Sequence, residues 1–201
     1  MIKCWYYDVS GLLDPEKFEA GLYSLPWDTR REKIARITRR EAALLPLGAG
    51  LLLKYALDIA GVTDMTLGEN EHGKPCLINN PDICFNLSHS GSIAICAVSE
   101  TPVGADVENI RAFSEKVSRR FFAPEETEWI TAQEDKNDAY TRLWTRKESY
   151  YKMLGTGITL PMDGLALIPG NDFNFVFTEK EIPGHRLCVC GDSEAEFGEW
   201  K

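Results

Sequence analysis

The sequence predicts an α+β fold built from two similar halves that meet near residue 102. In each half, helical patterns run into a pair of apolar strands, and the strand expected at 93–98 matches in pattern the one expected at 186–190. The chain has 201 residues, 44% of them hydrophobic, which allows a sizeable core. We therefore expect two α+β halves, residues 1–102 and 103–201, although the strands alone are a weak repeat signal.

Strand and helix signals follow one another along the first half. We expect a strand over residues 1–10, a helix capped by Asp28 that runs to about residue 40, and a long apolar helix over 40–60 that Gly61 ends. Pro46 should kink this long helix or mark its true start. The remaining elements are a turn at 73–75 and two strands, 83–87 and 93–98, joined through a turn at 88–91.

The second half begins with a strand over residues 103–110, after the break at Pro102. Three helices are expected next, one near 114–121, one from Pro124, and one over 137–154 that Gly155 ends. Two strands should follow at 173–177 and 186–190. The acidic tail from Asp192 is expected to be loose.

Composition restricts the kind of protein. The formal net charge of −9 argues against nucleic-acid binding. No apolar run reaches the ~18 residues that span a bilayer, and the start of the chain is too polar for a signal peptide. None of the six cysteines has the C-x-x-C spacing of a zinc site, so we expect reduced core thiols, while Cys188 and Cys190 leave a metal or redox pair open. We expect a cytoplasmic protein with neither membrane nor nucleic acid as a partner.

A basic stretch stands out against this acidic background. Residues 29–41 hold six basic and two acidic side chains, and Arg30 and Lys33 are among the basic ones. Such an island indicates a local anionic ligand, although a solvated helix face would have the same composition.

Two carboxylates on one strand point to metal chemistry. Asp106 and Glu108 alternate along the expected strand, so both face the same side about 7 Å apart, while Val107 faces the core. Like charges at this spacing repel unless a cation lies between them, and Mg²⁺ commonly takes one or two carboxylates together with phosphate oxygens. The alternative is an edge strand with solvated acids.

The last long helix carries a third carboxylate. Glu148 falls at the edge of an apolar stripe, and Lys152 follows one turn later. This placement suits a site, although an ordinary salt bridge between the two would give the same pattern. Lys147 falls in the middle of the stripe, where an unpaired charge is costly. We expect Lys147 to pair with a site carboxylate or to extend along its stem to the surface.

Hydroxyls and an imidazole lie between two expected strands of the first half. The turn Ser88-His-Ser-Gly91 would offer them to an anion together with free backbone N–H groups. A serine hydrolase is disfavoured, because adjacent Ser and His side chains rarely face each other and no G-x-S-x-G elbow is present. Ser88 and His89 are therefore candidate phosphate ligands.

Several short motifs follow one another along the chain. They are Gly73-Lys-Pro75, Phe85-Asn-Leu-Ser-His-Ser-Gly91, Gly104-Ala-Asp-Val-Glu108, Arg120-Phe-Phe122, and Trp144-Thr-Arg-Lys-Glu-Ser149 with Lys152 and Gly155-Thr-Gly157. In this order they resemble the 4′-phosphopantetheinyl transferases, and the surfactin-synthetase-activating (Sfp) type more than the short trimeric holo-acyl-carrier-protein synthases. The resemblance runs from the first strand to about residue 190.

The resemblance implies a pseudodimeric monomer with its active site in the cleft between the halves. It implies Mg²⁺ as cofactor, coenzyme A as co-substrate and an apo acyl or peptidyl carrier protein as partner. A serine hydroxyl of the carrier would attack the β-phosphate of coenzyme A, phosphopantetheine would be transferred, and 3′,5′-ADP would leave. Fatty acid, polyketide and nonribosomal peptide carriers all fit.

The resemblance also assigns roles to single residues. Asp106, Glu108 and Glu148 would hold the metal, and Glu148 would be the leading candidate to take the serine proton. Lys152 would be the second catalytic residue and would stabilise the leaving phosphate. The cofactor-binding set would comprise Arg30 and Lys33 at the 3′-phosphate, Lys74 along the cofactor, Ser88 and His89 at the phosphates, and Asp106 and Lys152.

The chain departs from the family at Leu45 and Pro46, where an arginine followed by threonine or serine is frequent, so one polar contact to the nucleotide should be missing. Residues 113–122, which include Arg119 and Arg120, are the expected carrier-docking segment. Two other functions remain open. A catalytically weak coenzyme A- or nucleotide-binding protein would have kept the cleft, which the intact carboxylates argue against. A Mg²⁺-dependent phosphohydrolase would lack an obvious water-positioning histidine cluster.

Overall fold

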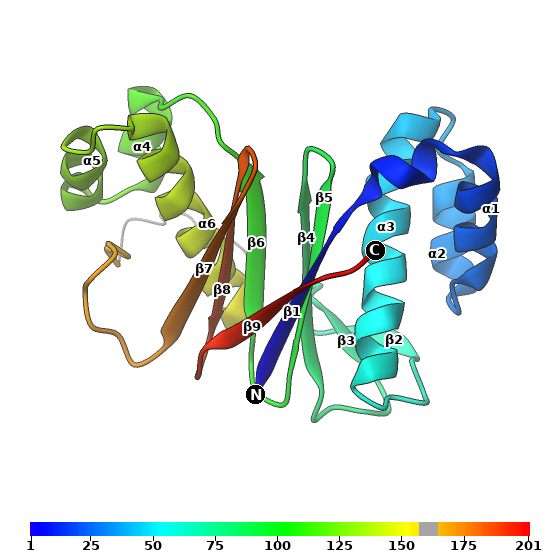
Figure 1. The fold of residues 1–201 in the computed structure, drawn as a ribbon. Helices are drawn as coiled ribbons and strands as arrows, with labels where there is room; N and C mark the ends of the chain where they lie inside the picture. The colour runs from blue at the N-terminus through cyan, green and yellow to red at the C-terminus, as the bar shows by residue number, and fades with distance from the viewer. Residues whose placement is uncertain (157–164) are drawn as a thin grey trace.

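A computed structural model describes residues 1–156 and 165–201; Gly157, the last residue of the expected motifs, lies outside them. The described strands form two main sheets and a small hairpin (Figure 1). The first sheet has the order β4-β5-β1-β9, with bounds Cys84–Ser90, Ile93–Ser99, Ile2–Asp8 and Ala195–Glu199. The second has the order β6-β8-β7, with bounds Gly104–Asn109, His185–Gly191 and Val176–Ile182. The hairpin pairs β2 (Leu67–Glu69) with β3 (Pro75–Leu77).

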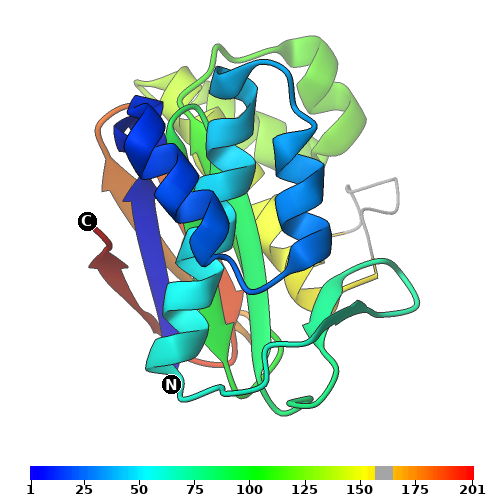
Figure 2. The ribbon, with the colours of Figure 1, turned by 90° about the vertical axis from the view of Figure 1, so that its right-hand side faces the viewer.

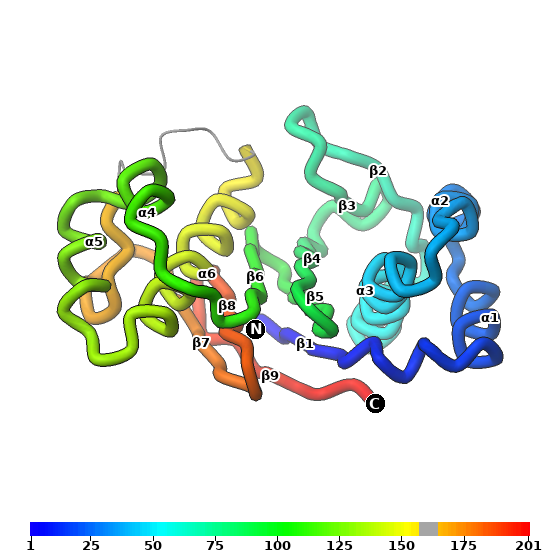
Figure 3. The backbone as a smooth tube through the Cα atoms, turned by 90° about the horizontal axis from the view of Figure 1, so that it is seen from above, coloured from blue at the N-terminus to red at the C-terminus, as the bar shows by residue number. Residues whose placement is uncertain are grey.

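The helices lie on the outer sides of the two sheets, as the view from above shows (Figure 3). Beside the first sheet lie a 3₁₀ turn and three helices, Val9–Leu13, α1 (Pro15–Ser24), α2 (Asp28–Ala35) and α3 (Arg40–Ile59). Beside the second lie α4 (Glu115–Phe121), α5 (Pro124–Thr131) and α6 (Lys136–Leu154). The prediction of a mixed α+β fold is confirmed.

The last three helices match their predicted bounds because their ends carry clear signals. The Ser114 side chain caps α4, Pro124 opens α5, and Gly155 ends α6 in the left-handed conformation with a φ of 69°. The prediction for α2 was wrong in two ways. Trp27, not Asp28, occupies the N-cap position, and the helix ends at Ala35.

The early helix boundaries follow from what the residues contact. Asp28 lies in the first turn of α2 and pairs with Arg31 instead of capping the helix. Ile34 is the one buried residue of α2, so little packing favours a longer helix. The next helix, α3, begins at Arg40 and runs through Pro46, which therefore does not mark its start.

Two further predictions, for the strand at 173–177 and for the tail, were also wrong. The strand expected at 173–177 is β7, which starts at Val176; the rings of Phe173 and Phe175 stack before it, with centroids 5.1 Å apart. The expected loose tail instead contains β9, which pairs in parallel with β1. Ala195 of β9 is buried, but the acidic residues around it mask the apolar signal of a strand in the sequence.

The turn expected at 88–91 is shorter than predicted. Ser88, His89 and Ser90 belong to β4 and pair with β5, so only Gly91 and Ser92 form the turn. Gly91 has a φ of 61°, which suits a two-residue hairpin turn. The backbone N–H groups of residues 88–90 are thus part of a strand and not of an anion-binding loop, which corrects the expectation from sequence.

The core is arranged in layers. Apolar residues of β1, β5 and β9 meet those of β6 and β8 in one cluster between the two sheets, while α3 covers the opposite face of the first sheet. All six cysteines are free thiols. The expectation of core thiols holds for the four that are buried, whereas Cys76 and Cys84 are half-buried. Among the described residues, α3 is the one helix long and apolar enough to cross a membrane. Because 61% of its apolar window is buried, it also fits the core helix of a soluble protein.

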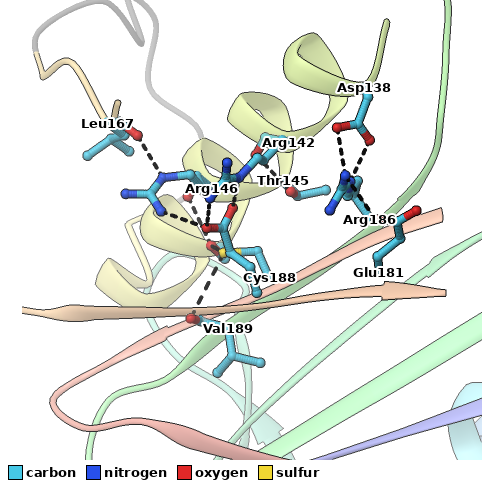
Figure 4. Close-up of polar contacts among 11 residues, drawn as sticks. Asp138, Arg142, Thr145, Arg146, Leu167, Glu181, Arg186, Cys188 and Val189 are labelled. Atoms are coloured by element: carbon cyan, nitrogen blue, oxygen red, sulfur yellow. Dashed lines mark hydrogen bonds and ion pairs between the residues drawn. The ribbon is translucent and has the colours of Figure 1, made fainter. Parts of the chain in front are cut away.

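The helix α6 is held firmly on the second sheet. Arg142 and Arg146 both contact the Glu179 carboxylate of β7, at 2.7 and 3.2 Å. Figure 4 shows that Arg146 also donates to the Leu167 carbonyl, and that Arg186 of β8 binds Asp138 near the start of the helix. Charged groups from both strands therefore fix the orientation of α6 on the sheet.

Close backbone contact between α6 and β6 depends on Gly104. A Cβ at this position would clash with the Ser149 carbonyl and with the Met153 backbone nitrogen. Only glycine lets the helix lie this near the strand that carries Asp106 and Glu108.

We expect Gly104→Ala to lower the free energy of unfolding by about 1–3 kcal/mol, because the methyl group would have to push the backbone of α6 away from β6. Gly11→Ala is the matched control, since a Cβ at Gly11 has no atom within 4 Å. Urea denaturation measures both. A loss for Gly104→Ala no larger than for Gly11→Ala would contradict the close packing of α6 on β6.

Candidate active site

The two sheets meet along β4 and β6, and side chains link the two strands. The amide oxygen of Asn86 accepts from the Ala105 N–H at 2.8 Å. The next links follow at two-residue intervals, the period at which strand side chains share a face. They run from the Ser88 hydroxyl to Asp106 at 2.7 Å and from the Ser90 hydroxyl to Glu108 at 2.9 Å.

Asp106 is the most buried member of this seam, with 2% of its surface exposed. One carboxylate oxygen, Oδ1, accepts from Ser88 and lies 2.6 Å from the Lys152 ammonium. The other, Oδ2, is buried and has no hydrogen-bond partner among the described residues. Burial raises the pKa of Asp106 above its ordinary value, against the opposing effect of the Lys152 charge. Asp106 therefore offers one free oxygen to a cation.

Glu108 lies two residues further along β6 and is half-buried. Its carboxylate accepts from Ser90 and lies 2.6 Å from the guanidinium of Arg111, which stacks over the Trp144 ring 5.0 Å away. Arg111 was not among the residues expected from sequence. Arg111 lies just after β6, outside any helix or strand, so no helical or strand periodicity marks it in the sequence.

Glu148 faces the other two carboxylates from α6. Burial is the main cause that raises its pKa from 4.5 to about 7, and the Asp106 charge adds to the effect. Lys152 does not form the ordinary salt bridge with Glu148 that its spacing allows. Its ammonium contacts Asp106 and the Ser88 hydroxyl, the latter at 3.0 Å. The structure thus places Asp106, Glu108, Glu148 and Lys152 in one neighbourhood, while their roles stay predictions.

These residues fit a divalent cation by their chemistry. Within residues 1–156 and 165–201, no group of three His, Cys, Asp or Glu side chains is close enough together to hold a metal. However, Asp106 keeps a buried, unpartnered oxygen, and Glu148 resists ionisation beside two other carboxylates. Oxygen ligands with excess negative charge are what Mg²⁺ prefers.

A cavity of about 1120 Å³ lies between α2, the start of α3 and the β2–β3 hairpin. Arg30 and Lys33 both line it, as does Pro46. The Arg30 guanidinium donates to the Pro46 carbonyl at 3.2 Å, while its Nε atom is buried without a partner among the described residues. Burial lowers the pKa of Arg30. Pro46 thus contributes a backbone acceptor at a position where this chain lacks the polar side chain frequent in the resembled family.

Gly50 is a residue that sequence reasoning missed. A Cβ at Gly50 would lie 2.8 Å from the Arg30 Nε atom, so the glycine leaves space for the guanidinium. A glycine inside an apolar helix was the available signal, because it lowers helix propensity and needs a packing reason.

His89 lies close enough to Lys152 of the carboxylate cluster and to Arg30 of the cavity for both charges to affect it. Its side chain is exposed at the surface, yet the surrounding protein partly desolvates the ring and lowers its pKa, and the charges of Lys152 and Arg30 add to this effect. A neutral ring beside two cations leaves His89 available as a hydrogen-bond partner.

Lys74 lies at the other end of the seam. Its ammonium donates to the backbone carbonyl of Lys152 at 2.6 Å and to that of Val103 at 3.1 Å. Burial lowers its pKa. The nearest partners of Lys74 are therefore backbone groups of α6 and of the segment leading to β6.

The expectation that Lys147 pairs with a site carboxylate or extends to the surface was wrong. The ammonium is fully buried and lies 2.8 Å from Glu126 of α5, which is also fully buried and is not one of the site carboxylates. Glu126 accepts as well from the backbone N–H groups of Ala123 and Leu167, both at 2.8 Å. Lys147 thus joins α6 to α5. The cost of its burial is offset by a partner that lies far along the chain, which the local pattern could not reveal.

Several known proteins are similar to this chain in sequence. The family model of the 4′-phosphopantetheinyl transferase superfamily matches residues 102–191. A 4′-phosphopantetheinyl transferase of Bacillus subtilis is 33% identical over 176 residues, which cover 83% of this chain and 76% of the relative. The 4′-phosphopantetheinyl transferase Sfp of Bacillus subtilis strain 168 is 31% identical over 80% of each chain. The 4′-phosphopantetheinyl transferase HetI of Nostoc sp. strain PCC 7120 is 42% identical over 90% of this chain and 84% of its own.

These relatives define the class of protein. The chain belongs to the 4′-phosphopantetheinyl transferase superfamily and is of the Sfp type.

The raised pKa of Glu148 makes a prediction about stability. The folded protein holds this proton to higher pH than the unfolded chain, so wild-type stability falls as the pH rises from about 4.5 through about 7. In metal-free buffer, Glu148→Gln should therefore be more stable than wild type at pH 8, by at most about 3 kcal/mol, and nearly equal at pH 5. Chemical denaturation at both pH values tests this; a stability difference independent of pH would contradict it.

The buried pair of Lys147 and Glu126 predicts a large loss on single substitution. Lys147→Met should lower the free energy of unfolding by about 3–5 kcal/mol, because Glu126 would be left charged and buried. Lys116→Met, at an exposed position of α4, is the control. Equal stability of the two variants in urea would show that the pair does not hold α5 against α6.

Proposed function

We propose that this protein transfers the 4′-phosphopantetheine group from coenzyme A to a serine hydroxyl of an apo acyl or peptidyl carrier protein and releases 3′,5′-ADP. The observation that carries the proposal is the convergence of Asp106, Glu108, Glu148 and Lys152 in a member of this superfamily. The names of the relatives support the same activity.

In this proposal Asp106, Glu108 and Glu148 hold Mg²⁺. The ion would neutralise charge on the pyrophosphate of coenzyme A. Glu148 is the leading candidate to accept the proton of the attacking serine, directly or through water. Its pKa of about 7 is that of the metal-free site, and a bound cation would lower it and keep the carboxylate ionised. Lys152 already lies at the seam beside Asp106 and Ser88, and its ammonium stabilises the leaving phosphate.

The nucleotide end of coenzyme A is assigned to the basic side of the site. Arg30 and Lys33 grip the 3′-phosphate from α2, in the wall of the 1120 Å³ cavity. The unpartnered Nε of Arg30 supports this role, since a buried donor without an acceptor is costly until a ligand supplies one. Ser88 and His89 contact the phosphates, Asp106 and Lys152 lie beside the pyrophosphate, and Lys74 lies near the same path.

The proposal includes the architecture of the family. Residues 1–102 and 103–201 would be the two halves of a pseudodimeric monomer, with β9 of the second half completing the sheet of the first, and the cleft between the halves would be the active site. Residues 113–122 are the proposed carrier-docking segment. Phe122 is buried in the cluster with Tyr140 and Leu143, so Arg119 and Arg120, which are exposed, would be the groups that meet an acidic carrier.

Incubation with coenzyme A, Mg²⁺ and a panel of apo carrier proteins tests the activity. We expect mass spectrometry to detect a phosphopantetheine adduct on the serine of at least one carrier. No adduct on fatty acid, polyketide or nonribosomal peptide carriers, together with measurable coenzyme A binding, would instead support a binding protein without transferase activity.

Single substitutions test the assigned roles. Asp106→Ala and Glu148→Gln should each lower turnover by about 10²-fold or more, with far-ultraviolet circular dichroism unchanged. Glu128→Gln, at an exposed position of α5, should retain the wild-type rate. Near-normal rates for Asp106→Ala would remove this residue from the metal site.

A further inference from the structure

The β2–β3 hairpin reaches across to the C-terminal end of α6, as the side view shows (Figure 2). Two of its side chains donate hydrogen bonds there. Lys74 binds the carbonyls of Lys152 and Val103, and the amide group of Asn70 binds the Gly155 carbonyl at 3.1 Å. An element far from α6 in the sequence thus caps the last turn of the helix.

The end of a helix needs such partners. The last four carbonyl groups of a helix have no partner within it, and the partial negative charge at that end attracts cations. Hydrogen bonds from an ammonium group are stronger than those between neutral groups. Lys74 supplies both a hydrogen-bond donor and a positive charge at the turn that carries Lys152.

The hairpin is itself arranged to present these donors. Asn70 Oδ1 accepts from the backbone N–H groups of His72 and Lys74, at 2.9 and 2.8 Å, and closes the turn between β2 and β3. Gly73, with a φ of 79°, allows that turn. Asn70 therefore fixes the hairpin through its oxygen and the helix end through its nitrogen.

Lys152 is held at both ends by this arrangement. Its carbonyl accepts from Lys74, while its ammonium lies 2.6 Å from Asp106 and 3.0 Å from Ser88. On the side facing β6, the glycine at 104 lets the same turn contact the strand directly. A shift of the last turn would move the ammonium away from Asp106.

We propose that Lys74 is a positioning residue that acts through Lys152: by capping the last turn of α6 from the hairpin, it sets where the Lys152 ammonium stands. The inference rests on the proposed transferase function and deepens it. It differs from a direct contact with coenzyme A, because two of the three ammonium protons are committed to backbone carbonyls.

The two roles predict different kinetics. A residue that only binds coenzyme A affects its affinity, whereas one that positions Lys152 affects the chemical step. Lys74→Met should lower kcat by about 10- to 100-fold, the loss expected for a misplaced group, while the dissociation constant for 3′,5′-ADP from titration calorimetry stays within about twofold of wild type. Lys17→Met, at an exposed position of α1, should change neither value.

A second measurement does not depend on activity. Amide hydrogen exchange in residues 153–156 should become faster in Lys74→Met, because the last turn loses its cap, and Lys74→Arg, which keeps donors to both carbonyls, should restore protection and part of kcat. Asn70→Asp, which keeps the hairpin oxygen but removes the donor to Gly155, should show the same signature more weakly. It also serves if Lys74→Met does not fold.

The outcomes separate the two proposals. If wild type modifies no carrier, the transferase proposal fails, while hydrogen exchange still tests the cap. Unchanged exchange at residues 153–156 in Lys74→Met would overturn the positioning role. An increased dissociation constant for 3′,5′-ADP with kcat unchanged would overturn it as well and place Lys74 on the cofactor.

Discussion

The ion pair between Lys152 and Asp106 is the contact on which the geometry of the site depends. It joins the last turn of α6 to β6, and through Ser88 it includes β4, so elements of both sheets converge on one buried carboxylate. A buried ion pair adds little net stability, because desolvation offsets most of the Coulombic attraction. Its effect here is orientation. Close packing at Gly104 and the arginines on Glu179 keep the helix and the strand at the separation that the pair requires.

The same site holds more negative charge than its basic residues neutralise. Lys152 contacts Asp106 and Arg111 contacts Glu108. Burial and these neighbouring carboxylates raise the pKa of Glu148 to about 7. A cluster of this kind favours a bound cation and supplies a proton acceptor at neutral pH. With a cation bound, Lys152 would no longer neutralise Asp106 alone, and its ammonium would be free to face a phosphate. The charge balance thus connects metal binding, proton transfer and leaving-group stabilisation in the proposed reaction.

Much of this was predictable from sequence where the signals are local. Alternation placed Asp106 and Glu108 on one face, and helical spacing placed Glu148 and Lys152 one turn apart. Contacts between distant segments were not predictable in this way. The partner of Lys147 proved to be Glu126, the acidic tail supplied β9, and Arg111 and Gly50 acquired meaning only through neighbours in space. The residues 88–90 joined a strand because pairing with β5 outweighed the turn-forming character of serine and glycine.

In the proposed reaction, the carboxylates of Asp106, Glu108 and Glu148 hold the cation that acts on the pyrophosphate. Anomalous diffraction from crystals grown with coenzyme A and Mn²⁺ in place of Mg²⁺ tests it most directly. We expect an anomalous peak within bonding distance of Asp106 Oδ2, an oxygen of Glu108, an oxygen of Glu148 and the pyrophosphate, with Lys152 close to the same phosphate group. A peak bound only by residues outside the seam, or an ordered pyrophosphate remote from Asp106 and Glu148, would contradict it.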